Sequence, residues 1–428
     1  MTDMVAVALH DGWYGCGTGA GRSNRTFLRA LIPMLAPSVR LRILPIRLVP
    51  SSAEYDASWH AGSGALLRPG DEVVPVDNGT DGLVRFGDVS HFREACRSAA
   101  RVMRELAGRS EQIFIAAFDA PFAGLASLLP GPLRSRLVYV PRSTGIAHSP
   151  ADAARIAFER TGIRTLIQAD GQIAAISGYM RTHLRDAYEV PDRHLVDLPN
   201  GLSPDDWTLT TSAFPPPPAA RDGFIFAMGR AQPYKGFDDL IDALVLVRTR
   251  QPVPHLVLAA VTESPQPTPY QRHLAARLNA DHIDATLLTR FDTQLRGLLA
   301  HPGLAAAIVP SRAEPFGRIM LEAYVGGAPV VTTTAGGLAD LARDGYTAFT
   351  CPPQQPAALA EAMDRALTAT PTEKIRMRTA ARAEAARHDH TETVQRFLRR
   401  AAPWALRPSG RDLAPGAQSM NPGAASGA

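Results

Sequence analysis

The stretch Ala305-Ala-Ala-Ile-Val-Pro-Ser-Arg-Ala-Glu-Pro-Phe-Gly-Arg-Ile-Met-Leu-Glu322 decides the fold. Its apolar first part predicts a buried strand, and its second part predicts a helix. A strand that leads directly into a helix is the unit of an open parallel α/β sheet, which binds ligands at the carboxyl ends of its strands. Glu314 and Glu322 would there accept hydrogen bonds from vicinal hydroxyls. The simpler alternative is a loop glutamate followed by one that the helix dipole favours.

A second strand-loop-helix unit favours the ligand site. Apolar residues 224–228 predict a strand, and Gly229-Arg-Ala-Gln-Pro-Tyr-Lys-Gly236 follows it, ahead of a helical pattern. Arg230 and Lys235, beside the N–H groups at a helix start, predict a site for a phosphate or diphosphate. The chain has only one other lysine, Lys374, so the placement of Lys235 in this loop is informative.

Two glycine-rich loops follow other predicted strands. Gly336 and Gly337 come after the strand predicted at 329–334, and such a pair lets backbone N–H groups approach an anion. The strand predicted at 5–9 leads into the pattern Gly15-x-Gly-x-Gly-x-Gly21. This spacing differs from the dinucleotide-binding fingerprint, so a Rossmann dehydrogenase is a poor interpretation. The loop instead allows a ligand to come close to the backbone.

In their order and spacing, these motifs resemble the retaining glycosyltransferases of the GT-B fold, family four, over nearly the whole chain. The resemblance implies two α/β, Rossmann-like domains with doubly wound parallel sheets that face a cleft. It implies transfer from a nucleoside-diphosphate sugar, UDP-GlcNAc or similar, with retention of anomeric configuration. Arg230 and Lys235 would hold the donor diphosphate, Glu314 the transferred sugar and Glu322 the ribose. The other implied donor-binding residues are Gly229, Phe316, Gly317, Gly336, Gly337 and Leu338.

Two positions depart from the family pattern. Asp340 ends the second glycine motif where the family usually has glutamate, which shortens the side chain but keeps the charge. The family commonly has a histidine just after the strand that here is predicted at 137–140, where this chain has Arg142. Either Arg142 replaces that histidine, or a longer loop brings His148 in. We favour Arg142, because His148 precedes a Ser-Pro step and a helix, which predicts a surface or capping role. The candidate catalytic residues are Arg230, Lys235, Glu314, Arg142 and His148.

The acceptor is expected at the first glycine loop. This loop and the residues after it look similar to bacterial family members that act on aminocyclitol or aminoglycoside antibiotics. A cationic acceptor of that kind requires acidic residues near the cleft, and Asp11 and Asp119 lie at predicted strand ends. The candidate acceptor residues are Gly17, Thr18, Gly19, Ala20, Asp11 and Asp119.

Three arginines, Arg22, Arg25 and Arg29, recur at helical spacing after the glycine loop. The ordinary interpretation is a solvated helix face. The alternatives are a surface for a phosphorylated acceptor or for an anionic membrane. No hydrophobic acceptor patch is evident in the sequence, which favours a small soluble acceptor.

At 428 residues, the chain is expected to form two domains. Residues 50–88 lack periodicity and predict a binding loop. The predicted strands lie near 5–10, 40–48, 113–119, 137–141, 173–177 and 194–199, and then near 224–229, 255–261, 285–290, 305–311 and 329–334. The expected parts are an acceptor-side domain at 1–205, a proline-rich linker at 206–222, a nucleotide-sugar-binding domain at 223–388, a helix crossing back at 389–406 and a disordered tail at 407–428.

Composition excludes several classes of protein. A net charge of +4 is too small and diffuse to indicate a nucleic-acid partner. Three scattered cysteines are typical of a reducing cytoplasm rather than a disulfide framework, and no motif supports Cys16 as a nucleophile. No apolar run approaches the roughly 20 residues of a membrane-spanning helix, and the first residues do not resemble a signal peptide.

The sequence predicts that no metal or other cofactor takes part. It contains no Asp-x-Asp triplet, which metal-dependent sugar-nucleotide enzymes usually need, and Arg230 and Lys235 supply positive charge instead. The stretch His388-Asp-His390 resembles a metal-binding fragment but has no third ligand, so we interpret it as surface.

Three alternatives remain beside a glycosyltransferase. A GT-B phosphorylase would share the carboxylates but use inorganic phosphate as its second substrate. A sugar-nucleotide epimerase of similar architecture would need no acceptor. A sugar-nucleotide-binding protein without activity would have lost one of the key residues, whereas Arg230, Lys235, Glu314 and Glu322 are all present.

Overall fold

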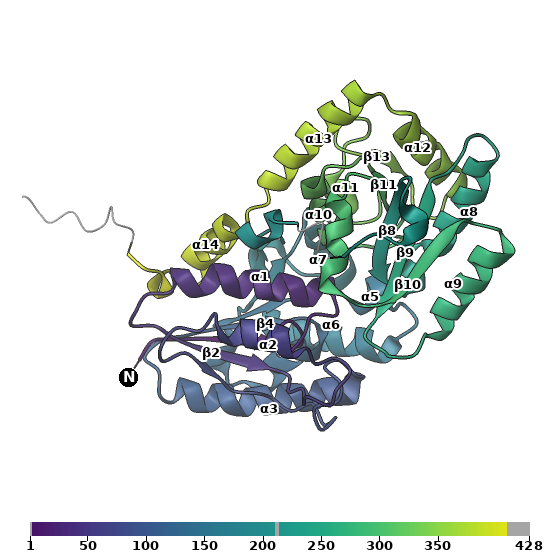
Figure 1. Cartoon of the computed structure of the whole chain (residues 1–428). Helices are drawn as coiled ribbons and strands as arrows, with labels where there is room; N and C mark the ends of the chain where they lie inside the picture. The colour runs from purple at the N-terminus through teal and green to yellow at the C-terminus, as the bar shows by residue number, and fades with distance from the viewer. Residues whose placement is uncertain (1, 210–213, 409–428) are drawn as a thin grey trace, which may run out of the picture.

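The computed structural model describes residues 2–209 and 214–408, which form two α/β domains, each built on one sheet (Figure 1). The sheet of the first domain has seven strands in the order β3-β2-β1-β4-β5-β6-β7, and all neighbouring pairs are parallel. Its strands are β1 (Met4–Leu9), β2 (Arg40–Pro45), β3 (Glu72–Val73), β4 (Ile113–Phe118), β5 (Leu137–Val140), β6 (Gln172–Ala175) and β7 (Leu195–Asp197).

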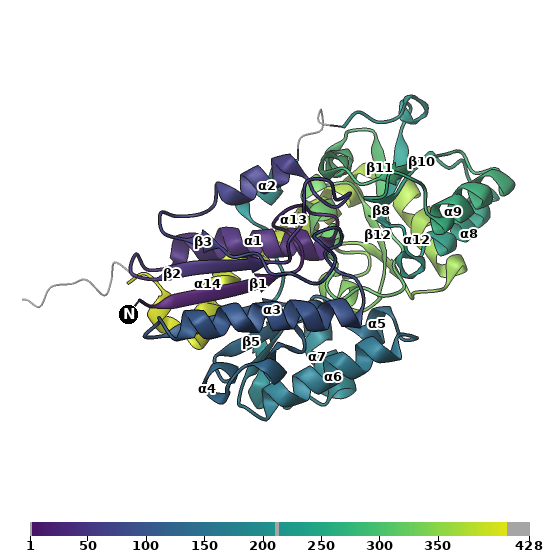
Figure 2. The same ribbon diagram turned by 90° about the horizontal axis from the view of Figure 1, so that it is seen from below.

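Both faces of this sheet are covered, because alternate side chains of β1 enter different cores. Val5 and Val7 pack in the core that contains Phe27 of α1, whereas Ala6 packs in the core that contains Met103 of α3. Figures 1 and 2 show α1 and α3 on opposite faces of the sheet. The helices of this domain are α1 (Gly19–Met34), α2 (Ala57–Gly64), α3 (Val89–Ala107), α4 (Gly131–Arg134), α5 (Gly145–His148), α6 (Ala153–Ile167) and α7 (Gly178–Tyr188).

The sheet of the second domain has six parallel strands in the order β10-β9-β8-β11-β12-β13. Its strands are β8 (Phe224–Arg230), β9 (His255–Thr262), β10 (Ala285–Arg290), β11 (Leu304–Val309), β12 (Val330–Thr333) and β13 (Phe349–Cys351). Its helices are α8 (Phe237–Arg248), α9 (Pro269–Ala280), α10 (Arg318–Gly326), α11 (Leu338–Leu341), α12 (Pro356–Thr368) and α13 (Pro371–Ala386).

The last helix, α14 (His390–Ala401), lies against α1 of the first domain (Figure 1). The chain after it stays there, since the backbone N–H of Ala36 donates to the carbonyl of Ala405 at 2.9 Å. The predicted linker includes residues 210–213, and most of the predicted tail is residues 409–428; both segments lie outside the described residues.

Each sheet has one point where the direction of winding reverses. In the first sheet β1 lies beside β4, and in the second β8 lies beside β11, so the connections on the two sides of each pair run in opposite directions. Such a reversal leaves a crevice at the carboxyl ends of the two strands, where open α/β sheets bind ligands. The strand ends that matter are therefore those of β1, β4, β8 and β11.

The predicted fold class is confirmed: two doubly wound parallel sheets face each other. All eleven predicted strands are present, with ends that differ by a few residues. Two short edge strands, β3 and β13, were not predicted, because two or three residues carry no periodic pattern. Residues 50–88, predicted as a loop, also contain the helix α2.

Candidate active site

A cavity of about 560 Å³ opens between the two domains at these strand ends. It brings together most of the predicted site residues from both domains. From the first domain its wall includes Gly17, Thr18, Gly19, Ala20, Asp119, Arg142 and His148, and from the second Gly229, Arg230, Lys235, Glu314, Phe316, Gly317 and Glu322. Four predicted residues, Asp11, Gly336, Gly337 and Leu338, do not belong to this wall.

The two motifs of the second domain meet at Lys235 and Glu314. The ammonium of Lys235 donates to Oε2 of Glu314 at 2.5 Å, and both side chains are mostly buried. An ammonium group has three N–H donors, so Lys235 keeps others for a further anion. Arg230, at the end of β8, is exposed and donates to the hydroxyl of Tyr234. The loop after β8 thus presents two cations to the cavity.

The loop between β8 and α8 depends on Gly236. Its φ is +70°, and a Cβ atom there would come within 1.9 Å of the carbonyl oxygen of Pro310. The first turn of α8 was predicted to face the anion, but it does not line the cavity. Asp238 and Asp239 instead place negative charge in that turn, at the positive end of the helix dipole. Asp239 also forms an ion pair with Arg312 at 2.5 Å.

The helix N-terminus at the cavity is that of α10 instead. Gly317 is its N-cap, has a φ of +96° and gives no side-chain cap, and the first turn contains no acidic residue. Gly317, Arg318 and Ile319 line the cavity, so their backbone N–H groups can meet a negatively charged ligand. Glu322, in the next turn, is buried, and its Oε1 accepts from Nε of Arg318 at 3.0 Å. The described contacts of Glu322 leave its second carboxylate oxygen for a ligand hydroxyl.

Gly336, Gly337 and Leu338 lie behind the Glu314 loop rather than on the cavity wall. The N–H of Gly337 donates to the carbonyl of Glu314 at 2.8 Å, and the N–H of Leu338 donates to Ala335 at 3.1 Å. These two N–H groups, expected to serve the ligand, are therefore already engaged. Asp340 accepts from the backbone N–H of Tyr179 at the start of α7, which ties this segment to the first domain.

The sequence predicted a surface or capping role for His148, but the structure places this residue on the cavity wall. It ends α5, lines the cavity and meets the ring of Tyr234 edge-on, with 5.2 Å between ring centroids. Burial lowers the pKa of His148 to about 4, so the imidazole is neutral at pH 7. Its Nδ1 is buried without a hydrogen-bond partner in the described part of the chain, which leaves it available to a ligand.

Arg142 also lines the cavity but is anchored on the first domain. Its Nε donates to Oδ1 of Asn24 at 3.0 Å, and its Nη1 donates to Asn200. The residue is 4% exposed, and burial lowers the pKa of its guanidinium to about 9. Arg142 therefore joins α1 to the chain after β7, whereas His148 reaches the donor loop of the second domain.

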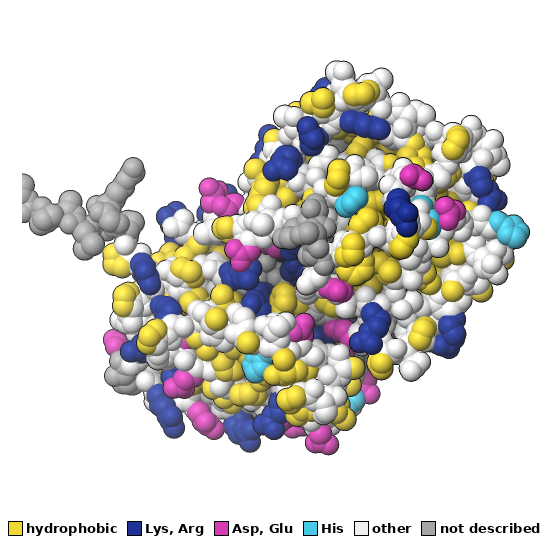
Figure 3. Space-filling view, in the orientation of Figure 1, with side chains coloured by type: hydrophobic (Ala, Val, Ile, Leu, Met, Phe, Trp, Pro, Cys, Tyr) yellow, Lys and Arg dark blue, Asp and Glu magenta, His cyan; other side chains and the backbone are white. Residues whose placement is uncertain are grey.

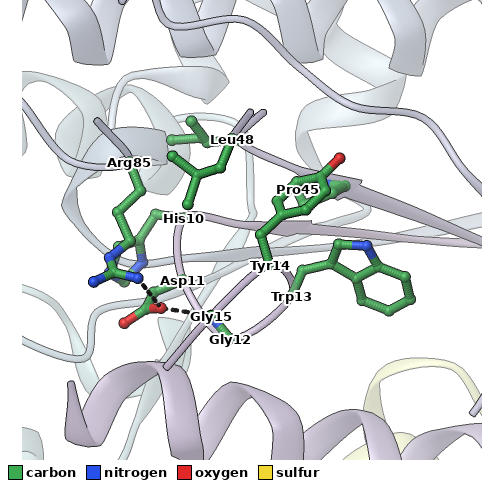
Figure 4. A pocket seen from close by; sticks show the side chains of 10 residues that line it. His10, Asp11, Gly12, Trp13, Tyr14, Gly15, Pro45, Leu48 and Arg85 are labelled. Atoms are coloured by element: carbon green, nitrogen blue, oxygen red, sulfur yellow. Dashed lines mark hydrogen bonds and ion pairs between the residues drawn. The ribbon is translucent and has the colours of Figure 1, made fainter. Parts of the chain in front are cut away.

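Asp11 holds the first glycine loop in place. It is buried, accepts from Thr18 Oγ1 at 2.5 Å, and pairs with Nη1 of Arg85 at 3.1 Å (Figure 4). Arg85 also contacts Glu54, which belongs with it to the segment 50–88, and Glu263, which follows β9 in the second domain. Gly17 passes so close to this cluster that a Cβ atom would lie 1.5 Å from Oε1 of Glu263. Asp11 was expected to meet the acceptor directly, and the structure instead places it beneath the loop.

Asp119 is at the end of β4 with a φ of +72°, a conformation that costs a non-glycine residue energy and often marks a functional site. Its carboxylate accepts from the N–H of Ser143 at 3.2 Å and lies 3.6 Å from Nε2 of His10. Sequence reasoning did not single out His10, Arg85 or Glu263. His10 and Glu263 directly follow strands, which is a usable signal, whereas Arg85 sits in an irregular insert without one.

Two sequence interpretations need correction. The arginines of α1 are not a solvated face: Arg25 is 7% exposed and Arg22 and Arg29 are partly buried. His390 is not at the surface but 1% exposed beneath α1, because it begins the helix α14 that packs there. The interpretation of Cys16 agrees with the structure, since burial raises the pKa of its thiol to about 12 and so disfavours the nucleophilic thiolate.

In residues 2–209 and 214–408, no group of three or more His, Cys, Asp or Glu side chains is arranged to hold a metal ion. Among the helices of these same residues, none combines the length and the apolar character that crossing a bilayer requires.

Comparison with known proteins relates the second domain to glycosyltransferases. Residues 211–385, which cover the second domain, match the family model described as "Glycosyl transferases group 1". The chain is 28% identical over 204 residues to a glycogen synthase of Mycobacterium tuberculosis, which covers 46% of each protein. It is 30% identical over 216 residues to a D-inositol 3-phosphate glycosyltransferase of Frankia alni, covering 48% of this chain and 52% of the relative. The chain thus spans about half the length of these curated relatives.

Solved structures match nearly the whole chain and establish the GT-B fold. Sucrose-phosphate synthase from Thermosynechococcus elongatus aligns over 92% of this chain and 97% of its own, with a TM-score of 0.71 and 17% identity. Anabaena Alr3699/HepE in complex with UDP and glucose aligns over 93% of this chain and 98% of its own, with a TM-score of 0.65 and 17% identity. Trehalose-6-phosphate synthase OtsA aligns over 95% and 100%, with a TM-score of 0.68 and 14% identity.

Proposed function

We propose that this chain is a retaining, metal-independent glycosyltransferase that moves a sugar from a nucleoside-diphosphate sugar to a small acceptor. One observation carries the proposal: Lys235 pairs with Glu314 at the strand ends of β8 and β11, on the wall of a cavity that the first domain closes from the other side. The family match of residues 211–385 supports transfer of a sugar, and the neighbour in complex with UDP and glucose supports a sugar-nucleotide donor.

The donor diphosphate would lie between two sources of positive charge. Lys235 and Arg230 supply cations from one loop, and the N-terminus of α10 supplies backbone N–H groups from the other. A leaving diphosphate gains negative charge as the bond to the sugar breaks, and preorganised donors stabilise that transition state. Since Lys235 also donates to Glu314, the same ammonium would link the diphosphate to the carboxylate that holds the sugar.

In this mechanism the acceptor attacks the face of the sugar from which the diphosphate leaves, so the anomeric configuration is retained. Glu314 orients the sugar hydroxyls and does not attack the sugar, because its ion pair with Lys235 lowers the nucleophilicity of its carboxylate. His148, neutral at pH 7 and with an unpartnered ring nitrogen, would hydrogen-bond the same sugar from the first domain. We therefore assign the role of the family histidine to His148 rather than Arg142.

The two cations also support metal independence. A divalent ion in sugar-nucleotide enzymes neutralises the diphosphate and is held by carboxylates. Here the carboxylates nearest the proposed diphosphate already have partners, Lys235 for Glu314 and Arg318 for Glu322.

The three cysteines are buried and form no disulfide, which supports a reducing compartment such as the cytoplasm.

The acceptor end of the cavity supports a small amine-bearing acceptor such as an aminocyclitol. One guanidinium, that of Arg85, faces three carboxylates: Asp11, Glu54 and Glu263. Glu54 and Glu263 line the cavity, so negative charge is in excess beside the glycine loop. Burial raises the pKa of Glu263 above its ordinary value, and an ammonium group beside it would relieve that cost.

A panel of sugar nucleotides, each with and without candidate acceptors, tests the function by mass spectrometry. We expect a glycosylated product and a released nucleoside diphosphate only when an acceptor is present. From an α-linked donor, the NMR spectrum of the product should show an α-linkage. Conversion of the sugar nucleotide to an isomer without an acceptor would establish an epimerase and refute the proposal. A product of inverted configuration would refute retention alone.

A further inference from the structure

A second cavity of about 370 Å³ lies beside the first, between α1 and the second domain. The two cavities share the wall residues Arg22, Thr293 and Arg296, so they are neighbours. Neither the donor motifs nor the glycine loop lines the second cavity. Its charged lining consists of four arginines and two aspartates, namely Arg22, Arg25, Arg29, Arg296, Asp205 and Asp206. Figure 3 shows Lys and Arg side chains gathered over α1 in the hollow between the domains.

Arg25 is the residue that this cavity leaves without a counter-ion. It is 7% exposed, and its guanidinium lies 4.4 Å above the ring of Trp59. Its Nη1 donates to the carbonyl of Trp59 at 2.8 Å and to Oγ of Ser63 at 3.0 Å, both neutral groups. Its Nε is buried without a partner in the described part of the chain.

The carboxylates near Arg25 are engaged elsewhere. Asp205 pairs with Arg29 at 2.7 Å, and Asp206 pairs with the buried Arg318 at 2.6 Å and with Arg296 at 3.3 Å. Asp56, which interacts with Arg25 at longer range, caps α2 and accepts from the N–H of Trp59 at 2.9 Å. Among the described residues, no carboxylate lies within ion-pair distance of Arg25, and residues 210–213 are Thr-Thr-Ser-Ala, which add no charge. Burial and the neighbouring arginines lower the pKa of Arg25 to about 10, so it remains charged at pH 7.

A buried cation without an anion is costly, and protein structures rarely keep one unless a ligand completes the pair. Positive charge is in excess here, and it comes from both domains: Arg25 and Arg29 lie on α1, and Arg296 lies between β10 and β11. Arginine forks match the geometry of phosphate oxygens. A wall that combines Arg25 with the half-buried Trp59 and the exposed Ser58 also fits a small organic molecule that carries the phosphate.

We propose that this second cavity binds a phosphate-type dianion through Arg25, Arg29 and Arg296, separately from the donor diphosphate site. Because these arginines come from both domains, the bound anion bridges the domains beside the active-site cavity. The anion is either free phosphate or the phosphate of a monoester, which the same arginines would recognise.

Thermal unfolding with inorganic phosphate, at constant ionic strength set by NaCl, tests this site. A ligand that binds only the folded state raises Tm with its concentration. We expect phosphate to stabilise the wild type, and Arg25→Met to weaken phosphate binding by about tenfold or more, as loss of a hydrogen bond between charged groups does. Methionine retains the apolar contact with Trp59. Arg29→Gln, on a partly exposed residue, should weaken binding in the same direction and serves if Arg25→Met does not fold.

Two controls separate this site from others. Arg101→Gln removes an exposed arginine of α3 and should leave the phosphate effect unchanged. Lys235→Met disables the proposed diphosphate site and should leave the Arg25-dependent part of the phosphate effect in place. A phosphate effect that disappears in Lys235→Met but persists in Arg25→Met would overturn the proposal, as would no effect in the wild type. These outcomes leave the proposed transferase activity untouched, since that is measured by product formation.

A comparison of inorganic phosphate with phosphate monoesters of sugars and polyols identifies the source of the anion. Arg25-dependent binding that is tighter for a monoester assigns the cavity to a phosphorylated small molecule. Equal binding assigns it to free phosphate. Binding of the unphosphorylated sugar as tightly as its monoester would overturn the proposal, because the arginines would then contribute nothing.

Discussion

Replacing Lys235 by methionine removes the cation that pairs with Glu314 and that we propose contacts the donor diphosphate. The substitution keeps most of the side-chain volume, and the ammonium it removes is mostly buried, with 16% of the side chain exposed. Two unit charges about 4 Å apart at an effective dielectric constant of ~20 interact by about 4 kcal/mol. Loss of one preorganised donor to a developing anion usually lowers turnover by about 10²–10³-fold. Both estimates agree, and we expect Lys235→Met to reduce kcat by that factor.

The assay is the steady-state release of nucleoside diphosphate in the presence of acceptor, with thermal melts to verify folding. Lys374→Met is the matched control, because Lys374 is the only other lysine of the chain and lies on α13, outside the cavity. It should retain the wild-type rate. Calorimetry with the bare nucleoside diphosphate should show weaker binding to Lys235→Met.

A double variant separates the two roles of the ammonium. Lys235→Met leaves Glu314 without its ion-pair partner, and this alone would reduce the rate if pairing were all that Lys235 does. Lys235→Met combined with Glu314→Gln removes the unpaired charge. If the double variant recovered most of the rate, or if Lys235→Met stayed within threefold of the wild type, the assignment of Lys235 to the diphosphate would be wrong.

Four further predictions have defined outcomes. Glu314→Gln should weaken binding of the sugar nucleotide more than that of the bare nucleoside diphosphate by calorimetry, since an amide donates where a carboxylate accepts; equal losses would contradict its role. Activity should persist in excess EDTA, and full inhibition that Mg²⁺ reverses would contradict metal independence. His148→Ala should lower kcat by roughly 10²-fold, as loss of one preorganised hydrogen bond to the reacting group does, whereas Arg142→Ala should mainly lower Tm because it joins two segments of the first domain; the reverse pattern would exchange their roles. Burial lowers the pKa of His390 to about 3, so between pH 6.5 and about 3 the unfolded state binds more protons and the free energy of unfolding falls as pH falls. His390→Gln should flatten that fall by up to about 1.4 kcal/mol per pH unit in chemical denaturation, and an unchanged slope would refute this cause.

The strands that carry the site could be predicted because they are buried on both faces. Every residue of β1 and of β4 is buried, so each appears in the sequence as a continuous apolar run. The same logic places Lys235 and Glu314, which lie in the loops that follow β8 and β11, and Glu322, which lies one helical turn further along α10. A residue that directly follows a strand can therefore be assigned to the sheet edge from the sequence.

Residues that reach the site by a longer route could not be placed in this way. His148 lies beyond a loop, and only the turn made by α5 returns it to the cavity against Tyr234. Arg85 belongs to the irregular segment 50–88, whose path is fixed by the ion pairs that Arg85 makes with Asp11, Glu54 and Glu263. A sequence pattern does not reveal these pairs. The N–H groups of Gly337 and Leu338 were misjudged for a related reason: the sequence identifies a glycine turn but not which carbonyl already accepts from it.

The loop that contains Glu314 is held in place by contacts with both domains, so ligand binding there depends on how the two domains are arranged. The carbonyl of Pro315, next to Glu314, accepts from Oγ of Ser177 in the first domain at 2.6 Å. Arg318, at the start of α10, donates to Thr26 at 3.2 Å and to the carbonyl of Gly201 at 2.9 Å, also in the first domain. A rotation of one domain against the other would break these contacts and shift both the Glu314 carboxylate and the N-terminus of α10. The first domain therefore does more than close the cavity, because it holds the loop on which the proposed chemistry depends.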